Sequence, residues 1–168
     1  MINIVLYEPE IPGNTGNIMR TCAGTGTMLH LIEPLGFKLD EKSIKRSGVN
    51  YIDKVNYKVY KDWNHFLEEN EGEFYFLTRY GKVPHTSCDF SDVNKNIYLC
   101  FGKESTGIPK DILREHLDRC FRIPTNANVR SLNLSNCVAL VLYEVLRQQD
   151  YPNLLRTEPF KGEDWLEK

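Results

Sequence analysis

The chain has 168 residues, 41% of them hydrophobic and 26% charged, with 21 basic against 23 acidic side chains. This size and composition are typical of one globular domain, and a net charge of −2 does not by itself indicate a nucleic-acid-binding protein. No apolar run approaches the roughly 20 residues of a membrane-spanning helix. The start, MINIVLYEPE, lacks the basic region and cleavage site of a signal peptide. We therefore expect a cytoplasmic protein without membrane contact.

Apolar, β-branched runs alternate along the chain with helical patterns. In chain order the predicted elements are strand 2–6, helix 15–24, strand 28–32, helix 41–46, strand 55–60, helix 63–69, strand 74–77, strand 97–101, helix 109–116, strand 120–123 and helix 133–148. This alternation predicts an α/β fold with a mainly parallel sheet and helices on both faces. The last stretch, 151–168, carries two prolines and four acids and is expected to be a loosely packed tail.

The cysteines and histidines give no sign of a disulfide framework or a metal site. They are Cys22, Cys88, Cys100, Cys120, Cys137, His30, His65, His85 and His116. The cysteines include no C-x-x-C pair and mostly lie in apolar runs, which favours buried free thiols. The histidines are far apart and lack partners at metal-ligand spacing. We predict structural or surface roles for all of them and no metal.

Three segments that follow predicted strands have an unusual composition. They are PGNTGNIMR at 12–20, FGKESTGIP at 101–109 and IPTNANVRSLNLSN at 123–136. In open α/β sheets, ligands bind outside the carboxyl ends of the strands. The three segments therefore predict a functional site at one edge of the sheet.

Two common phosphate-binding motifs are absent from the chain. The pattern G-x-x-x-x-G-K-[ST] does not occur, because Lys103 is followed by Glu104. A dinucleotide fingerprint at 24–26 lacks its third glycine and ends a predicted helix instead of opening one. These observations argue against a P-loop protein and a nicotinamide-dependent dehydrogenase. Gly102 and Gly107 still permit a tight turn and close approach to a ligand.

The third segment is rich in side-chain amides and hydroxyls. They belong to Thr125, Asn126, Asn128, Ser131, Asn133, Ser135 and Asn136. A helix cap needs one or two such residues, so the remainder suit a neutral, hydrogen-bonding ligand such as a purine with its ribose. In the first segment, Arg20 lies near Asn14 and is a candidate for positioning an anion or a hydroxyl, the alternative being an ordinary surface arginine.

The motifs NTGNIMR, FGKESTGIP and SLNLSN, in this order and spacing, closely resemble the three motifs of the SPOUT superfamily of methyltransferases. The opening and the ending of the chain are similar to the small single-domain tRNA 2′-O-ribose methyltransferases that act on the anticodon wobble nucleotide. The resemblance extends from Met1 to about Leu155. Gly13 and Lys103 depart from the pattern, since proline is common at the first position and proline or serine at the second.

The resemblance implies one methyltransferase domain over 1–155, with a deep carboxyl-terminal trefoil knot, and an acidic tail over 156–168. It implies S-adenosyl-L-methionine as the cofactor and a homodimer with each active site completed near the subunit boundary. The implied cofactor contacts are Leu77, Gly102, Ile123, Ser131, Leu132 and Asn136.

By the same resemblance, Arg20 orients and activates the ribose 2′-hydroxyl of nucleotide 34, a cytidine or modified uridine. Because arginine is a poor general base, we favour stabilisation of the developing alkoxide, with the proton leaving to phosphate or water. Asn14, Glu104 and Ser135 are candidates for placing Arg20 or the ribose. The tRNA anticodon stem-loop would be bound by basic residues of the dimer surface, Lys38, Lys42, Lys45, Arg46 and Arg130.

Two other interpretations stay open at this point. One is a methyltransferase of the same superfamily that acts on ribosomal RNA or on another tRNA position. The other is a non-catalytic RNA-binding scaffold that keeps the fold without the chemistry.

Overall fold

The computed structural model describes residues 1–40, 42 and 52–168. Its strands are β1 (Ile2–Tyr7), β2 (Met28–Ile32), β3 (Tyr57–Tyr60), β4 (Glu73–Leu77), β5 (Val83–Pro84), β6 (Ile97–Phe101) and β7 (Cys120–Arg122). Its α-helices are α1 (Pro12–Thr25), α3 (Trp63–Glu69), α4 (Lys110–Arg114) and α5 (Leu134–Gln148). Short 3₁₀ helices occupy Ile52–Lys54, His85–Ser87, Leu117–Arg119 and Trp165–Glu167.

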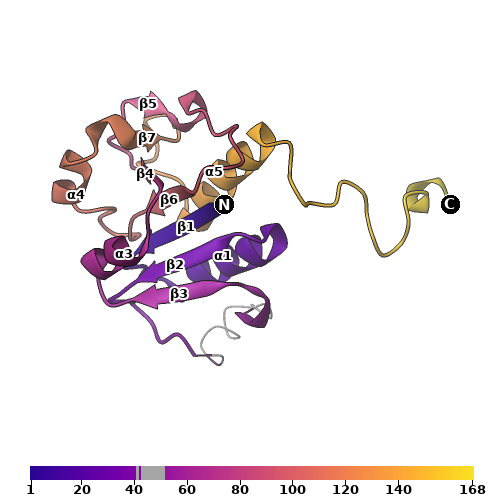
Figure 1. The fold of residues 1–168 in the computed structure, drawn as a ribbon, viewed down its shortest axis with the longest axis horizontal. Helices are drawn as coiled ribbons and strands as arrows, with labels where there is room; N and C mark the ends of the chain where they lie inside the picture. Colours follow the sequence, from indigo (N-terminus) through magenta and orange to yellow (C-terminus); the bar gives the residue numbers. More distant parts are fainter. Residues whose placement is uncertain (41, 43–51) are drawn as a thin grey trace.

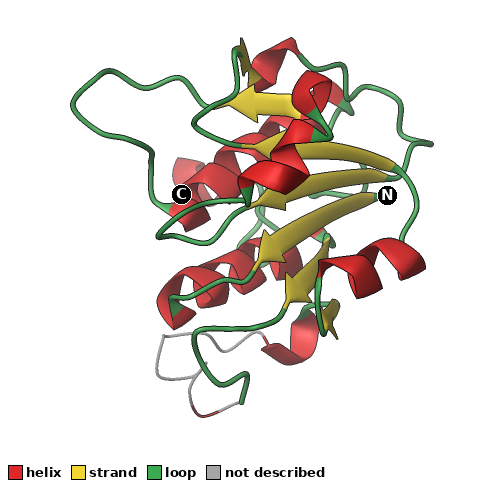
Figure 2. Ribbon diagram, turned by 90° about the vertical axis from the view of Figure 1, so that its left-hand side faces the viewer, coloured by secondary structure: helices red, strands yellow, loops and turns green. Residues whose placement is uncertain are grey.

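Within the described residues, seven strands form one sheet in the order β3-β2-β1-β6-β4-β7-β5, and every neighbouring pair is parallel. Helices α1 and α5 pack on one face of the sheet, and α3 and α4 on the other (Figures 1 and 2). This arrangement confirms the predicted α/β fold class. The trefoil knot itself stays a prediction.

The central strands β1 and β6 are almost wholly apolar, with Asn3 as the exception, because both faces of the sheet are covered. In β1, Ile4 and Leu6 belong to the core beneath α1 and α5, whereas Val5 belongs to the core beneath α3 and α4. Successive side chains of a strand point to opposite faces, so one short strand contributes to two cores.

Several predicted boundaries differ from those in the structure. Helix α1 begins at Pro12, so the whole of the first polar segment, 12–20, is helical. Proline fits this first position because the N–H that it lacks would have no partner there. Helix α4 spans five residues where eight were predicted, and Pro109 is its N-cap. Strand β5 was not predicted. The predicted helix 41–46 lies outside the described residues except for Lys42.

The five cysteines are free, as predicted. Burial raises the pKa of the Cys22 and Cys88 thiols to about 12. In the described part of the chain, no group of three or more His, Cys, Asp or Glu side chains could hold a metal ion. A search of the same residues finds no helix long and apolar enough to span a membrane.

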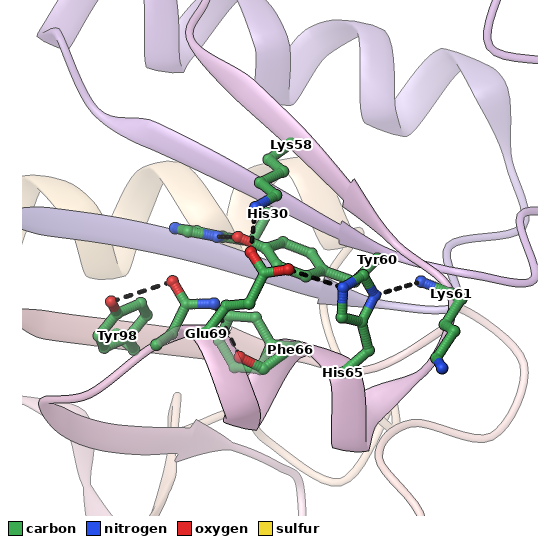
Figure 3. Close-up of polar contacts among 9 residues, drawn as sticks. His30, Lys58, Tyr60, Lys61, His65, Phe66, Glu69 and Tyr98 are labelled. Carbon is green, nitrogen blue, oxygen red and sulfur yellow. Dashed lines mark hydrogen bonds and ion pairs between the residues drawn. The ribbon is translucent and has the colours of Figure 1, made fainter.

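His30 lies in the core beneath α3, against the ring of Phe66 (Figure 3). Its Nε2 is 3.0 Å from Asn3 Oδ1 and its Nδ1 is 2.9 Å from the Tyr60 hydroxyl. Because Asn3 Oδ1 can only accept, Nε2 carries the proton and Nδ1 accepts from Tyr60. Burial, helped by the positive charge of Lys58, lowers the pKa of His30 to about 4. His30 is therefore a neutral structural residue.

The carboxyl-terminal segment extends away from the sheet (Figure 1). Tyr151 and Leu154 still pack against the core beneath α1 and α5. Beyond them, Leu155, Phe160 and Leu166 are 77%, 92% and 88% exposed. The division at residue 155 stays a prediction.

Candidate active site

Three parallel strands end side by side at one edge of the sheet. Leu77, the last residue of β4, is paired with Phe101 at the end of β6 and with Phe121 in β7. The segments that leave these strands surround a cavity of about 660 Å³. Pockets of about 300–1,000 Å³ are typical of sites for small organic ligands. The cavity therefore lies where the sequence predicted a site.

A chain of hydrogen bonds joins the three polar segments beside this cavity. The Glu104 carboxylate accepts from the backbone N–H of Glu10 at 2.8 Å, from the backbone N–H of Ile11 at 3.2 Å, and from Asn14 Nδ2 at 3.2 Å. Asn14 Oδ1 in turn accepts from Asn133 Nδ2 at 3.0 Å. Glu104 thus fixes the start of α1 against the loop after β6, and Asn14 links both to the start of α5.

Asn133 is also the N-cap of α5. Its Oδ1 accepts from the Ser135 backbone N–H at 3.0 Å and from the Ser135 hydroxyl at 2.6 Å. Such a cap satisfies N–H groups that the first turn of a helix leaves without partners. Capping leaves Asn133 Nδ2 free to bind Asn14, so one side chain orders the helix and the site together.

The loop after β6 turns back on itself within a few residues. Gly107 N–H donates to the Lys103 carbonyl at 2.9 Å, and Gly107 has φ 74°, a left-handed conformation that favours glycine. At Gly102 a Cβ atom would come within 2.1 Å of the Gly107 carbonyl carbon. Lys103 extends from this loop to Glu8, with 2.7 Å between Nζ and Oε2. Glycine is therefore required at 102 by close packing and favoured at 107 by backbone conformation.

The structure brings most of the candidate residues to the cavity wall. Those that line it are Asn14, Leu77, Gly102, Glu104, Ile123, Ser131 and Leu132. Asn136 and Ser135 are not among the lining residues; Asn136 is exposed on α5, and Ser135 takes part in the cap. The lining combines apolar residues such as Leu77, Ile123 and Leu132 with polar ones such as Asn14 and Ser131, which suits an organic ligand with both apolar and hydrogen-bonding parts.

Arg20 is placed away from the cavity of its own chain. It is exposed on α1 and is absent from the cavity lining. Six residues separate Arg20 from Asn14, or about 600° of helical rotation, so the two side chains point about 120° apart. A single chain therefore does not bring Arg20 together with Asn14 and Glu104.

Sequence reasoning did not single out several lining residues. Thr78, Arg79 and Tyr80 directly follow β4, and Arg122 ends β7. Their positions at strand ends were a usable signal, because ligands gather at the carboxyl edge of such sheets. Their composition was not unusual enough to draw attention to them.

A parallel α/β sheet with a ligand-sized cavity at the carboxyl ends of its strands, lined by polar loops, defines a protein with a binding site for a small organic ligand. The sequence profile of the SpoU rRNA Methylase family matches residues 1–143. The chain belongs to this family and is a methyltransferase.

Comparison with individual proteins gives the same family. The chain is 46% identical over 154 residues to the tRNA (cytidine(34)-2′-O)-methyltransferase of Escherichia coli (strain K12), covering 90% of this chain and 96% of the other. A relative from Geobacillus stearothermophilus, provisionally given the same enzyme name, is 53% identical over 154 residues, covering 91% and 98%. A solved structure described as "Structural insights into the 2-OH methylation of C/U34 on tRNA" is 37% identical with a TM-score of 0.82, covering 89% and 97%.

Proposed function

We propose that this chain transfers a methyl group from S-adenosyl-L-methionine to the ribose 2′-hydroxyl of the anticodon wobble nucleotide of tRNA, a cytidine or modified uridine at position 34. The observation that carries the proposal is the meeting of the three polar segments around one cavity, in a chain whose relatives are named for this reaction. A tRNA substrate implies a cytoplasmic location.

The residues of the cavity fit the proposed cofactor. Leu77, Ile123 and Leu132 supply apolar surface, and Gly102, packed against the Gly107 backbone, adds backbone atoms to the cavity wall. Ser131 adds a hydroxyl. When bound, S-adenosylmethionine supplies an electrophilic methyl group, so the work left to the protein is positioning and handling of the hydroxyl proton.

The hydrogen-bond chain assigns positioning roles to Glu104 and Asn14. Three N–H donors already occupy the Glu104 carboxylate, which makes it a poor candidate for a general base. Asn14 uses both ends of its amide, one toward Glu104 and one toward Asn133. We assign both residues to holding the start of α1 and the loops at the geometry that the ribose requires.

Arg20 would act across a subunit boundary. The Arg20 of the partner subunit would enter each cavity and stabilise the developing alkoxide, while the proton leaves to phosphate or water. Two observations support a homodimer: Arg20 is exposed and does not line the cavity of its own chain, and α5 exposes Leu140 and Tyr143 by 47% and 48% on one stripe. Large apolar side chains exposed together often mark an interaction surface.

The basic residues predicted to grip tRNA are only partly described. Lys38, Lys42 and Arg130 are exposed, and Arg130 lines the cavity. Lys45 and Arg46 lie outside the described residues. Exchange of both for glutamate is expected to raise the KM for RNA and to leave cofactor affinity unchanged.

The experiment that tests the proposed function uses bulk tRNA from a strain deleted for this gene. The tRNA is incubated with purified protein and tritiated S-adenosylmethionine, and the label is mapped by nuclease digestion and mass spectrometry. A 2′-O-methyl group at nucleotide 34, lost in Arg20→Ala, is the expected result. Label elsewhere in tRNA rejects the proposed nucleotide. The absence of both methylation and cofactor binding would indicate an RNA-binding scaffold.

The family description favours one further candidate, because it names ribosomal RNA as the substrate. The same assay with ribosomal RNA from the deletion strain distinguishes the two substrates. Label in ribosomal RNA and none in tRNA would replace the proposed substrate with this one.

A further inference from the structure

A second hollow, of about 550 Å³, adjoins the cofactor cavity. Four residues line both spaces, so the two are adjacent: Arg79, Tyr80, Arg122 and Arg130. The rest of its wall is formed by residues 126–129, two of them asparagines, and no acidic side chain lines it. With three guanidinium groups, one phenol ring and no acid, this hollow differs from the adjacent cavity, which is also lined by Glu104.

The turn that presents Arg79 and Tyr80 is fixed to the sheet. Thr78 N–H donates to the Phe121 carbonyl at 2.9 Å, Gly81 N–H donates to the Thr78 carbonyl at 3.1 Å, and Tyr80 N–H donates to Thr78 Oγ1 at 3.2 Å. A Cβ at Gly81 would lie 2.5 Å from the Phe121 carbonyl carbon, so this turn packs directly on the backbone of β7. The two side chains therefore project from a rigid support.

Tyr80 is exposed although its ring lies at the mouth of a cavity. The side chain is 67% exposed, and the Arg79 guanidinium carbon is 4.8 Å from the centre of its ring. Exposed aromatic rings and planar guanidinium groups are the surfaces on which single-stranded RNA bases stack. The pair thus offers a stacking surface next to the site of methyl transfer.

The three guanidinium groups keep their charge uncompensated. Arg122 donates to the Arg79 carbonyl at 3.2 Å and to Thr125 Oγ1 at 3.4 Å, both neutral acceptors. In the part of the chain that the structure describes, neither Arg79, Arg122 nor Arg130 forms an ion pair. Arg147, by contrast, is paired with Glu144 at 2.9 Å. Unpaired cations around a hollow favour a polyanion such as a phosphodiester backbone.

We propose that this hollow binds a nucleotide adjacent to the methylated one, with its base stacked on Tyr80 and its phosphate held by Arg79 and Arg122. This inference rests on the proposed function, since it requires the target ribose to lie in the neighbouring cavity. The reason is that the two spaces share four lining residues: an RNA segment whose one nucleotide faces the methyl donor can place the next nucleotide against Tyr80.

The first test measures RNA affinity by fluorescence anisotropy of a labelled anticodon stem-loop RNA. Tyr80→Ala is expected to weaken binding by about 5- to 160-fold, the range typical of one lost base stack. Tyr80→Phe keeps the ring and should bind as the wild type does. Trp165→Ala is the matched control, because Trp165 is also exposed, with the Lys161 ammonium 4.9 Å from its ring, but lies in the tail. Equal affinities for Tyr80→Ala and Trp165→Ala would overturn the proposal.

A second measurement tests the phosphate contact through its salt dependence. Arg79→Gln should reduce the slope of log affinity against log salt by about one, as expected when one phosphate contact is lost. Arg156→Gln is the control, since Arg156 is exposed and contacts Asp150 in the carboxyl-terminal segment. An unchanged slope in Arg79→Gln would contradict the assignment.

A third measurement identifies the stacked base. Stem-loop RNAs that lack the base on one or the other side of nucleotide 34 are bound to wild type and to Tyr80→Ala. With one of these two RNAs, the tyrosine exchange should cause no further loss, because the stack is already absent. Additive losses with both RNAs would refute stacking on a neighbouring base. An equal loss of S-adenosylmethionine affinity in Tyr80→Ala, measured by calorimetry, would instead assign the hollow to the cofactor.

Failure of this proposal is distinguishable from failure of the proposed function. If the wild type methylates nucleotide 34 while Tyr80→Ala binds RNA normally, the nucleotide-binding role of the hollow is wrong and the proposed function is supported. If RNA binding depends on Tyr80 and on an adjacent base while methylation occurs at another nucleotide, the nucleotide-binding role of the hollow is supported and the assignment of the methylated nucleotide to position 34 is wrong.

Discussion

Asn133 Nδ2 lies 3.0 Å from Asn14 Oδ1, across a sequence separation of 119 residues. The contact joins the first turn of α1 to the N-cap of α5, and through Glu104 it also reaches the loop after β6. Three segments that are remote in sequence are thus held by one continuous set of side-chain hydrogen bonds. The predictions below test this arrangement, the cavity beside it, the subunit boundary and the buried histidine.

Asn14→Asp is expected to destabilise the protein by about 1–3 kcal/mol, the cost of losing a buried hydrogen bond. The exchange removes the donor that faces Glu104 Oε1 at 3.2 Å and places two carboxylates against each other. Urea denaturation at pH 7 measures the effect. Asn17→Asp, exposed on the same helix, is the control and should change the free energy of unfolding by less than about 0.5 kcal/mol. Equal stability of the two variants would show that the Asn14 contact contributes nothing.

Gly102→Ala should weaken S-adenosylmethionine binding by about tenfold or more, because the added methyl group displaces a loop whose backbone lines the cavity. Isothermal titration calorimetry gives the affinity directly. Gly13→Ala serves as the control, since no atom lies within 4 Å of the Cβ it would introduce. Normal cofactor affinity in Gly102→Ala would mean that the loop tolerates displacement and is not the binding wall.

Mixing of inactive variants tests whether Arg20 acts on the partner subunit. Arg20→Ala and Gly102→Ala are each expected to have little methyltransferase activity as homodimers. After subunit exchange, half of the dimers combine the two variants, and each has one intact site if Arg20 works across the boundary. About one quarter of wild-type activity should then return. No recovery in a mixture shown to have exchanged subunits would place Arg20 in its own chain's site.

The free energy of unfolding should decrease as the pH is lowered from about 6.5 to 4, because of His30. Its pKa is lowered to about 4 in the folded protein from an ordinary 6.5, so in this range the unfolded chain binds a proton that the folded one excludes. The contribution of neutral His30 to the free energy of unfolding is fully present above pH 6.5 and is lost as the pH falls toward 4. It amounts to about 3 kcal/mol at most.

Chemical denaturation across this pH range, compared between wild type and His30→Gln, isolates that contribution. Hydrogen bonds from Arg147 and Gln148 lower the pKa of Glu144 to about 2, so its contribution is lost below pH 4.5 in both proteins and cancels in the difference. Parallel pH profiles for the two proteins would show that His30 is not the group responsible.

The fold was predictable because its signals are local. Uninterrupted apolar runs such as β6 indicate strands buried on both faces. The alternation of strands with helices predicts a parallel sheet with helices on both faces. Strand β5 has two residues, one of them Pro84, which leaves no periodicity to detect. The resemblance to a known family supplied the cofactor and the reaction, which no periodicity could have supplied.

The candidate site was predictable only in part, because its geometry depends on contacts between distant segments. Gly102 could be singled out from composition alone. That Ser135 serves the N-cap through Asn133, and that Arg20 projects away from Asn14, follow from helix boundaries: α1 begins at Pro12 and α5 after Asn133. Tyr80 had only its position shortly after β4 as a signal, and a single tyrosine after a strand is too common to be singled out by composition.

The two outer strands of the sheet carry features that discourage growth by strand addition. At one end, β5 is two residues long and contains Pro84, which has no N–H to offer a neighbour. At the other, β3 places Lys58 on the outermost ribbon, where an incoming strand would have to bury an ammonium group. Edge-to-edge polymerisation is therefore disfavoured at both margins of the sheet that the structure describes.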